Sequence, residues 1–549
     1  MCALLMSANW NDTKMPVQAS KDDAGVSTSY TLTLSDGTVV VVWNQPGDRS
    51  MSPDFGGWGG VQFWMNSFDA DGNSLCNGPL LISGNHGTRS WTQYNHKMAM
   101  VDKDDNIIVA VEDCRNLEAL GDYENHDMSY ILYKLDKYGN MLWDEPVDLG
   151  RGMASNHYGF SMCQLADGSY VTGWGTQCDD LGLGAKYMYI MMERVSNDGK
   201  LLWDETKAWY DSDTANMYCY ITEGGDNEFN VVTAHGSGQF VTARRYDFEG
   251  EPVWTKDCTI NYGSMGSIPM HVQFVIEEDG EGGLYAGWHD FTVDGNYDVA
   301  KLAHINREGK HVYNIGIGGT QVTYFINPEE GWALRSCYVK FVEDKESNDV
   351  YVLHRIFDGS SQTWNGIAMQ KLDERGNLMW GPEGSKFQDV EKRDLNYEQI
   401  SLDDEGNPVA FYLENPYNPE TYSIDIKMYV EKLSAVDGSP MWSERVAEPT
   451  DPQYNNINDL QVTPMINNEF WVLSWTCTTG AGGRDDDMLY VMRVNNDGTT
   501  KVLDVKGDKT NDAPAEYFDI NGVTVSGNNL TPGIYIKRQG SEVSKFIVK

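Results

Sequence analysis

A short turn that ends in glycine recurs eight times along this chain of 549 residues, and it constrains the fold more than any other sequence feature. The copies read "FDADGNSLC", "LDKYGNMLW", "VSNDGKLLW", "YDFEGEPVW", "INREGKHVY", "LDERGNLMW", "LSAVDGSPMW" and "VNNDGTTKV". Their glycines are Gly72, Gly139, Gly199, Gly250, Gly309, Gly376, Gly438 and Gly498, at spacings of 67, 60, 51, 59, 67, 62 and 60 residues. A period kept over 426 residues predicts repeated structural units rather than one continuous core.

Each copy also contains a β-prone run upstream of its turn, such as "SDGTVVVVW", "ADGSYVTGW", "EGGLYAGW" and "NNEFWVLSW". Together the two landmarks predict roughly four short strands per copy, and helical periodicity is absent throughout. Four-stranded units repeated four to eight times are typical of a β-propeller. The sequence therefore predicts an all-β, eight-bladed β-propeller, with seven blades as the alternative, followed by a short C-terminal β tail.

An aromatic residue follows the turn glycine by four positions in six of the copies. These residues are Trp143, Trp203, Trp254, Tyr313, Trp380 and Trp442. Cys76 and Val502 interrupt the pattern in the first and last copies, as terminal repeats often do. A large flat side chain in this register is expected to wedge between neighbouring blades and to hold the ring of blades together.

This Gly-x-x-x-Trp spacing resembles the tryptophan-docking motif of eight-bladed pyrroloquinoline-quinone propellers. The resemblance implies a similar blade construction only, because those dehydrogenases use an adjacent pair of cysteines and no two cysteines are adjacent here. The Asp-box of sialidases is a poorer match, because its Trp follows Gly by three residues. The whole repeat is most similar to that of uncharacterised Bacteroidetes surface propellers.

The two ends of the repeat region suggest how the ring closes. The eighth copy has the weakest outer strand, "TTKVLDVKG". Near the N-terminus, Lys14-Met15-Pro16-Val17 is similar to the outer-strand segment Glu145-Pro146-Val147-Asp148. We therefore expect the N-terminal segment to complete the eighth blade.

The composition divides the chain into four parts. Residues 1–8 end in small residues after an apolar stretch and are interpreted as the remnant of a signal peptide. Residues 9–506 form the propeller of eight repeats of about 60 residues, and residues 507–515 are small and polar, as in a linker. The tail, residues 516–549, carries a net charge of +1 and contains "YFDINGVTV", "LTPGIYI" and "SKFIVK".

These three segments resemble the C-terminal sorting domain, subclass A, of the Bacteroidetes type IX secretion system. The resemblance covers about the last 34 residues. It implies export across both membranes and release or anchoring at the cell surface. The type IX secretion machinery would then be a partner of residues 516–549, and the protein would be secreted or displayed at the outer-membrane cell surface.

Charge and hydropathy exclude several classes of function. The chain holds 41 Lys+Arg and 82 Asp+Glu, so its formal charge is −41. This argues against nucleic acid, which is bound through Lys and Arg on phosphates, and against anionic membrane surfaces. Hydrophobic residues make up 40% and aromatic residues 12% of the chain, which is enough to bury a core. No apolar run approaches the ~20 residues that span a bilayer, so no transmembrane segment is predicted.

Candidate ligand contacts lie in loops and at strand starts. Aromatic residues in connecting loops could stack on sugar rings, or alternatively pack beneath the loops: Trp58, Trp91, Tyr94 and Trp364. Three histidines fall near the starts of innermost strands and could bind a ligand or a metal, or be structural: His96, His157 and His271. No cofactor is predicted other than Ca²⁺, for which Asp485, Asp486 and Asp487 are the candidate ligands. The alternative is that these carboxylates cap their own turn.

The chain contains no Gly-x-Ser-x-Gly elbow, His-Glu-x-x-His helix, P-loop or complete EF-hand loop. The interpretation therefore leans away from an enzyme, and no catalytic residue is assigned. We expect a secreted or surface-displayed binding module for glycan or protein. The alternatives are a surface glycoside hydrolase or lyase with channel-facing carboxylates, a sialidase-like enzyme, and a structural surface protein.

Overall fold

The structure is a computed structural model, and it describes twenty-four stretches of the chain. These are residues 17–20, 25–26, 28–47, 59–88, 97–113, 129–150, 156–177, 189–209, 216–235, 240–262, 274–291, 298–323, 334–358, 363–387, 395–414, 417–418, 423–424, 427–447, 456–478, 487–498, 516–519, 524–525, 533–539 and 542–548.

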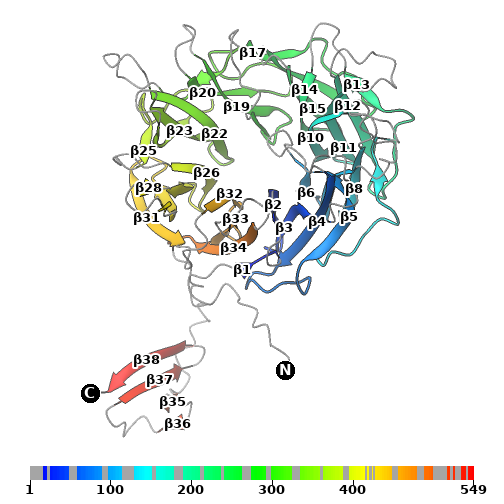
Figure 1. The fold of residues 1–549 in the computed structure, drawn as a ribbon. Coiled ribbons are helices and arrows are strands. Elements are labelled where there is room, and N and C mark those ends of the chain that lie inside the picture. Colours follow the sequence, from blue (N-terminus) through cyan, green and yellow to red (C-terminus); the bar gives the residue numbers. More distant parts are fainter. Residues whose placement is uncertain are drawn as a thin grey trace. The chain divides into compact units, whose positions relative to one another are not determined.

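Six antiparallel sheets of four strands and one of eight, in which the pairing of Gly87 with Asp113 joins blades 1 and 2, surround a common axis, which confirms the eight-bladed β-propeller (Figure 1). The described residues contain no helix. Within them, the search for a helix long and apolar enough to cross a membrane finds none. We number the blades 1 to 8 in chain order and name the strands of a blade from the innermost, nearest the axis, to the outermost.

The strands of the first four blades follow one another along the chain. Blade 1 consists of β2 (Thr28–Thr33), β3 (Val39–Pro46), β4 (Gly59–Phe68) and β5 (Leu80–Thr88). Blade 2 consists of β6 (Ala99–Val101), β7 (Ile107–Asp113), β8 (Ser129–Leu135) and β9 (Val147–Asp148). Blade 3 consists of β10 (Asn156–Gln164), β11 (Tyr170–Gln177), β12 (Tyr189–Val195) and β13 (Lys207–Trp209). Blade 4 consists of β14 (Asn216–Gly225), β15 (Glu228–His235), β16 (Phe240–Asp247) and β17 (Cys258–Tyr262).

The second half repeats this order until the last blade. Blade 5 consists of β18 (Val275–Glu278), β19 (Leu284–Phe291), β20 (Asp298–Ile305) and β21 (Thr320–Gln321). Blade 6 consists of β22 (Leu334–Asp344), β23 (Asp349–Asp358), β24 (Thr363–Leu372) and β25 (Ser385–Phe387). Blade 7 consists of β26 (Leu395–Leu402), β27 (Pro408–Glu414), β30 (Lys427–Leu433) and β31 (Pro440–Ala447), with a small hairpin of β28 (Tyr417–Asn418) and β29 (Ser423–Ile424). Blade 8 consists of β32 (Asn456–Val462), β33 (Phe470–Thr478), β34 (Met488–Asn495) and, from the other end of the chain, β1 (Val17–Gln18).

The pairing of β1 with β34 closes the ring, as the sequence predicts. Val17 lies opposite Val491 and Gln18 opposite Tyr490 in an antiparallel register. The backbone N–H of Ala19 donates to the Leu489 carbonyl at 2.7 Å, which extends the contact past the strand. The first strand of the chain therefore completes the last blade, as its outermost strand, and links the two ends of the repeat region.

The hydrophobic core lies between the blades rather than within them. One buried cluster joins Ile108 and Leu132 of blade 2 to Phe160 and Trp174 of blade 3. Comparable clusters join the blades of the remaining pairs around the ring, blades 7 and 8 among them. Each sheet is therefore covered on both faces by its neighbours, which explains why the middle strands are apolar at nearly every position.

The aromatic residues that follow the turn glycines lie at these interfaces. The indole Nε1 of Trp143 donates to the Asn197 carbonyl of the next blade at 2.9 Å, and Trp203 and Trp254 donate in the same way to Phe248 and Arg307 at 3.0 Å. Each ring lies flat against the next turn glycine, so a Cβ on Gly199 would come within 2.8 Å of Trp143.

The tyrosine and the last two tryptophans of this series lie at the later interfaces. Tyr313 packs against Gly376, and Trp380 packs against Gly438. Trp442 lies within β31 and packs against the core shared by blades 7 and 8. Glycine is required at these turns for two reasons, a positive φ (80° at Gly376) and the space that the ring occupies.

A second repeated contact, made by charged residues, accompanies the aromatic one. Five residues before the turn glycine (six before Gly438), the third strand carries Lys, Arg or His in seven of the eight copies. Each of these side chains pairs with a carboxylate at the turn between the two innermost strands of its own blade. The pairs are Lys134–Asp102, Arg194–Asp167, Arg245–Glu228, His304–Asp279, Lys371–Asp349, Lys432–Asp403 and Arg493–Glu469. The sequence interpretation missed this series, although its fixed distance from the glycine is a readable signal.

Residues Val502–Lys549 form a second compact unit. Its described strands are β35 (Glu516–Asp519), β36 (Thr524–Val525), β37 (Gly533–Gln539) and β38 (Glu542–Val548), in the sheet order β36-β35-β37-β38. The tail segments that resemble a secretion signal contribute to all four strands: "YFDINGVTV" to β35 and β36, "LTPGIYI" to β37 and "SKFIVK" to β38.

The Trp143→Ala substitution tests the aromatic contact between blades. Trp143 is 5% exposed, so its removal deletes a buried ring and its hydrogen bond to Asn197, and we expect a loss of ~3–5 kcal/mol in unfolding free energy. Urea denaturation followed by tryptophan fluorescence measures this loss. The control is Leu142→Ala at the adjacent residue, which is 45% exposed and is expected to change stability by less than ~0.5 kcal/mol. Equal effects of the two substitutions would contradict the docking role.

The Asp102→Asn substitution tests the charged contact through its pH dependence. Burial alone raises the pKa of Asp102, but hydrogen bonds from Tyr170, Asn106 and Lys134 outweigh burial and hold the pKa below its ordinary value. Because the folded pKa lies below the unfolded value of ~3.9, the stabilisation is present above that value and is lost as the pH falls through the folded pKa.

We therefore expect Asp102→Asn to lower the melting temperature strongly at pH 7, where it leaves Lys134 buried without its counter-charge, at a cost of ~3–5 kcal/mol. The difference from the wild type should shrink as the pH falls below ~4, because the wild-type carboxyl is then itself neutral. Thermal unfolding from pH 2 to pH 8 measures this difference in melting temperature. The control is Asp144→Asn, at an exposed position. A difference that is the same at every pH would contradict the prediction.

Candidate functional site

A cleft lies between blades 4 and 5, beside the outermost strand of blade 4. It has a volume of about 670 Å³. One side is formed by β17 and the residues that precede it, from Val253 to Tyr262. The other side is formed by Arg307–Gly309, His311 and Ile317 of blade 5.

An insertion in blade 5 creates this cleft. The outermost strand begins eight residues after the turn glycine in blades 2, 3 and 4 (147 − 139, 207 − 199 and 258 − 250) but eleven residues after it in blade 5 (320 − 309). The additional residues lie in "IGIGG", where Gly316, Gly318 and Gly319 all have positive φ. The Gly318 N–H donates to the Ile260 carbonyl at 2.9 Å, so this segment reaches the outer edge of β17. The longer connection thus builds the second wall against the edge strand of blade 4.

Exposed apolar side chains gather at this cleft. Val253 is 41% exposed, Tyr262 is 57% exposed and Ile317 is 46% exposed, and all three line it. Ile315, in the same inserted segment, is 57% exposed. Exposed apolar side chains in a concave surface are unusual on a strongly acidic protein. Their combination with a few polar groups is the usual composition of a ligand-binding site.

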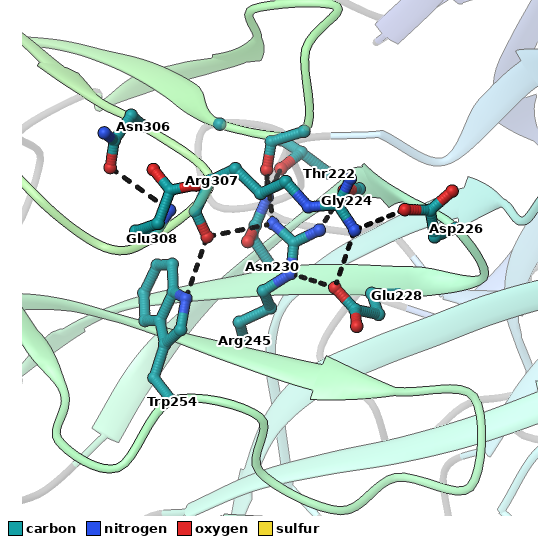
Figure 2. Close-up of polar contacts among 12 residues, drawn as sticks. Thr222, Gly224, Asp226, Glu228, Asn230, Arg245, Trp254, Asn306, Arg307 and Glu308 are labelled. Carbon is teal, nitrogen blue, oxygen red and sulfur yellow. Dashed lines mark hydrogen bonds and ion pairs between the residues drawn. The ribbon is translucent and has the colours of Figure 1, made fainter.

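Buried charges form the inner end of the cleft. Arg245 is 1% exposed, and its Nε lies 2.5 Å from Oε2 of Glu228. Its Nη1 donates to the Gly282 carbonyl of blade 5 at 2.6 Å and to the Arg307 carbonyl at 3.4 Å, while its Nη2 donates to the Gly224 carbonyl. Figure 2 shows these groups converging on the guanidinium between the two blades. Arg245 therefore fixes the relative position of the two walls.

Arg307 belongs to the same cluster (Figure 2) and is more exposed than Arg245. Its Nη2 is 2.5 Å from Asp226 and 3.6 Å from Glu228, and its carbonyl accepts the indole N–H of Trp254 at 3.0 Å. The side chain is 40% exposed, so the guanidinium remains accessible at the cleft. The aromatic contact between blades 4 and 5 thus also orients a charged side chain of the site.

A second arginine fixes the segment that carries the exposed polar residues. Nε and Nη2 of Arg244 donate to the two carboxylate oxygens of Asp257 at 2.7 Å each, and the guanidinium lies over the Trp209 ring at 4.3 Å. The neighbouring Lys256 is exposed and lines the cleft. The lining contains three bases (Arg245, Lys256, Arg307) and three acids (Glu228, Asp257, Glu308), so its formal charge is 3 − 3 = 0 in a chain of −41.

The one thiol in this cleft is not a nucleophile. Burial raises the pKa of Cys258 to about 11, so the thiol is protonated at neutral pH. His311 Nε2 lies 4.0 Å from the sulfur, but it lies 2.9 Å from the Thr259 carbonyl and must therefore carry the proton that it donates there. Cys258 and His311 thus do not form a thiolate and base pair.

Two of the three carboxylates of the cleft are paired with arginines. Glu228 is paired with Arg245 and Arg307, and Asp257 is held in a bidentate contact by Arg244. The described lining accordingly offers hydrogen-bond donors and acceptors and an apolar surface. These are the groups of a binding site.

Most of the loop residues that the sequence analysis proposed as ligand contacts lie outside the described residues. These are Trp58, Trp91, Tyr94, His96, His271, Asp485 and Asp486. His157 lies near the start of β10, an innermost strand, and Trp364 lies in β24. Asp487 is buried at the start of β34, where its carbonyl accepts the Val26 N–H at 2.9 Å. Within the described part of the chain, no group of three His, Cys, Asp or Glu side chains is placed to hold a metal ion.

The cysteines that the structure describes are buried thiols. Cys76, Cys163, Cys219, Cys258 and Cys477 are free and buried. The cleft between blades 4 and 5, by contrast, was missed by the sequence analysis. Its signals in the sequence are the longer fifth copy and the glycine-rich "IGIGG" that follows Tyr313.

No family model matches the sequence. No curated protein matches it either. Solved structures are similar in fold: the polysaccharide lyase Uly1 has 10% identity and a TM-score of 0.43, over 73% of this chain and 90% of that one. An ulvan lyase of the polysaccharide lyase family PL25 has 12% identity and a TM-score of 0.42, over 79% and 97%. A protein of unknown function from Dyadobacter fermentans has 10% identity and a TM-score of 0.38, over 88% and 98%. Identities this low carry no information on activity.

Proposed function

We propose that this protein is a secreted or surface-displayed propeller that binds glycans in the cleft between blades 4 and 5. The observation that carries the proposal is the gathering of exposed apolar side chains, Val253, Tyr262 and Ile317, in a cleft that also presents charged and hydroxyl groups. A sugar ring has this same double character, with apolar C–H faces and a polar rim of hydroxyl groups.

The arrangement fits a sugar better than a wholly apolar ligand. Tyr262 supplies an exposed aromatic face on which a ring can stack. Thr255, Lys256 and Glu308 supply donors and acceptors around it. The buried ion pairs beneath hold these groups on strands and tight turns, which reduces the ordering cost of binding.

Binding is favoured over catalysis because the described lining lacks a free acid and base pair. Glycoside hydrolysis needs two carboxyl groups, of which one is protonated and able to donate. Here two of the three lining carboxylates, Glu228 and Asp257, are paired with arginines. The function supported by the cleft is therefore recognition.

The Tyr262→Ala substitution tests this site on the purified full chain. A glycan array, with and without Ca²⁺, identifies a ligand, and isothermal titration calorimetry then compares the variants. We expect at least tenfold weaker binding by Tyr262→Ala, because truncation of a central aromatic anchor costs ~2 kcal/mol or more. The matched control is Tyr138→Ala, since Tyr138 is similarly exposed at 51% but lies outside the cleft.

Two outcomes would oppose the proposal. Glycan binding that is unchanged in Tyr262→Ala would move the site elsewhere on the molecule. If no glycan binds with or without Ca²⁺, a protein ligand or a structural role would replace glycan binding as the proposed function.

We further propose that residues 516–549 direct export by the type IX secretion system. The support is the resemblance of "YFDINGVTV", "LTPGIYI" and "SKFIVK" to the sorting domain, together with the separate compact unit that contains them. A strongly acidic propeller would remain soluble at the surface through its charge.

Deletion of residues 516–549 tests the export proposal. In a bacterium that has this secretion system, we expect the whole chain at the cell surface or in the medium and the shortened chain in the periplasm. Cell fractionation and immunoblotting measure the distribution, and a strain without the secretion system provides the control. Surface display of the shortened chain in equal amount would contradict the role of the tail.

A further inference from the structure

A second cleft, of about 470 Å³, lies between blades 5 and 6. Its lining includes Asp279, Glu281 and His304 of blade 5 and Glu343, Glu374 and Arg375 of blade 6. Tyr285 closes the inner side, stacked on the His304 ring with the centroids 4.2 Å apart. Comparison with the interfaces between the other blades explains why a cleft occurs between blades 5 and 6.

At six of the other seven interfaces, a long cation bridges the two neighbouring blades, whereas between blades 1 and 2 the position is Ser67, whose hydroxyl donates to the Lys137 carbonyl at 2.5 Å. The Lys or Arg of the third strand binds the carboxylate of its own blade and also donates to the turn before the glycine of the next blade. The six bridging contacts are Lys134 to Asn197, Arg194 to Phe248, Arg245 to Arg307, Lys371 to Ala435, Lys432 to Asn496 and Arg493 to Ala70. A positively charged head group therefore occupies the same place at six interfaces.

Blade 5 carries histidine at this position. His304 Nε2 lies 3.0 Å from Oδ2 of Asp279, so it keeps the bond within its own blade. The imidazole is shorter than a Lys or Arg side chain, and among the described residues it makes no hydrogen bond to blade 6. The corresponding turn residues of blade 6, Glu374 and Arg375, line the open cleft instead. The cleft is thus the place that a cationic head group fills at six other interfaces.

The aromatic contact also changes at this interface. Tyr313 stands where blades 2 to 4 have Trp, and its hydroxyl is buried without a hydrogen-bond partner. The Oγ1 of Thr320, which lies against the same glycine, is likewise buried and unpartnered. Tyr313 and Thr320 are each only 4% exposed. Both the charged and the aromatic position therefore depart from the repeat at this interface, as they also do between blades 1 and 2, where Ser67 contacts Cys76 and the Lys137 carbonyl.

The lining contains four acids (Asp279, Glu281, Glu343, Glu374) and one permanent base (Arg375), so its formal charge is 1 − 4 = −3 without His304. Two of these acids already meet a cation of the chain, since Lys345 pairs with Glu343 and Arg375 Nε lies 3.6 Å from Glu374. Asp279 and Glu281, on the blade 5 side, are the carboxylates that remain for a cationic ligand. Tyr285 donates to Glu343 at 2.8 Å, which holds one of these carboxylates on the blade 6 side. Asp279 accepts the Glu281 and Gly283 N–H groups at 2.8 and 2.7 Å, which fixes another on the blade 5 side.

We propose that the cleft between blades 5 and 6 binds a ligand through a primary ammonium or guanidinium group. The head group would take the place that Lys or Arg fills at six other interfaces, between the Asp279 turn and the Glu374 turn. The rest of a small ligand fits in the remaining volume. This site is separate from the proposed glycan cleft and does not depend on it.

Titration with simple amines tests the proposal on the full chain. The probes are 1,4-diaminobutane and arginine amide, with 1,4-butanediol as the uncharged control. We expect the two cations, but not the diol, to bind in calorimetry and to raise the melting temperature, because a ligand that binds only the folded state stabilises it. A stronger response to one of the probes distinguishes an ammonium from a guanidinium site.

Two variants locate the binding. His304→Lys supplies the missing head group from within the chain, so we expect a higher melting temperature without ligand and at least tenfold weaker amine binding. Glu281→Gln removes one negative charge and is expected to weaken binding severalfold. The matched control is Glu405→Gln, because Glu405 occupies the same turn position in blade 7, where Lys432 already fills the interface.

The outcomes separate clearly. Failure of the wild type to bind either amine would overturn the proposal, as would equal binding by the wild type and His304→Lys. If His304→Lys does not fold, the comparison of Glu281→Gln with Glu405→Gln decides, and equal effects of the two would overturn it. Tyr262→Ala is expected to leave amine binding unchanged, which keeps this result distinct from the glycan test.

Discussion

The structure depends on the contact between one blade and the next. A single four-stranded sheet whose middle strands are apolar on both faces cannot be stable in water by itself, because each face must be covered. The covering is provided by the neighbouring blades, and the aromatic residue placed on the next turn glycine fixes their spacing. Trp143 on Gly199 shows the arrangement, with a buried ring, a close glycine and one directed hydrogen bond.

The charged contacts between blades determine how neighbouring blades are oriented relative to each other. A buried Lys or Arg needs counter-charges and acceptors, and at most interfaces these come from two blades at once. Arg245 takes a carboxylate from blade 4 and carbonyls from blade 5, so the two blades can meet in only one relative position. Burial of such a charge contributes more to specifying the arrangement than to net stability.

Where the repeat is regular, the interfaces are filled, and both candidate sites lie where it is irregular. Blade 5 takes part in both: its longer outer connection builds the cleft against blade 4, and His304 leaves the cleft against blade 6. The physical reason is common to the two cases. In a regular copy, the surface between neighbouring blades is buried. An insertion or a shorter side chain leaves part of that surface exposed to solvent, where a ligand can reach it.

The sequence by itself determined the eight blades, the role of glycine in the turns, the aromatic residues at the interfaces and the closure of the ring by the N-terminal strand. All of these rest on local spacing, which repeats and can therefore be read along the chain. It also predicted sugar contacts and metal ligands in the long loops, and most of those residues lie outside the part that the structure describes.

Only the tertiary structure decided which side chains meet across blades. Arg245, Gly282 and Arg307 are separated by up to 62 residues, and no local pattern reveals that one guanidinium binds both carbonyls. The effect of His304 likewise depends on the distance to a turn in the next blade. Periodicity determines the architecture of such a chain, whereas the places where ligands bind depend on how the irregular copies fit their neighbours in space.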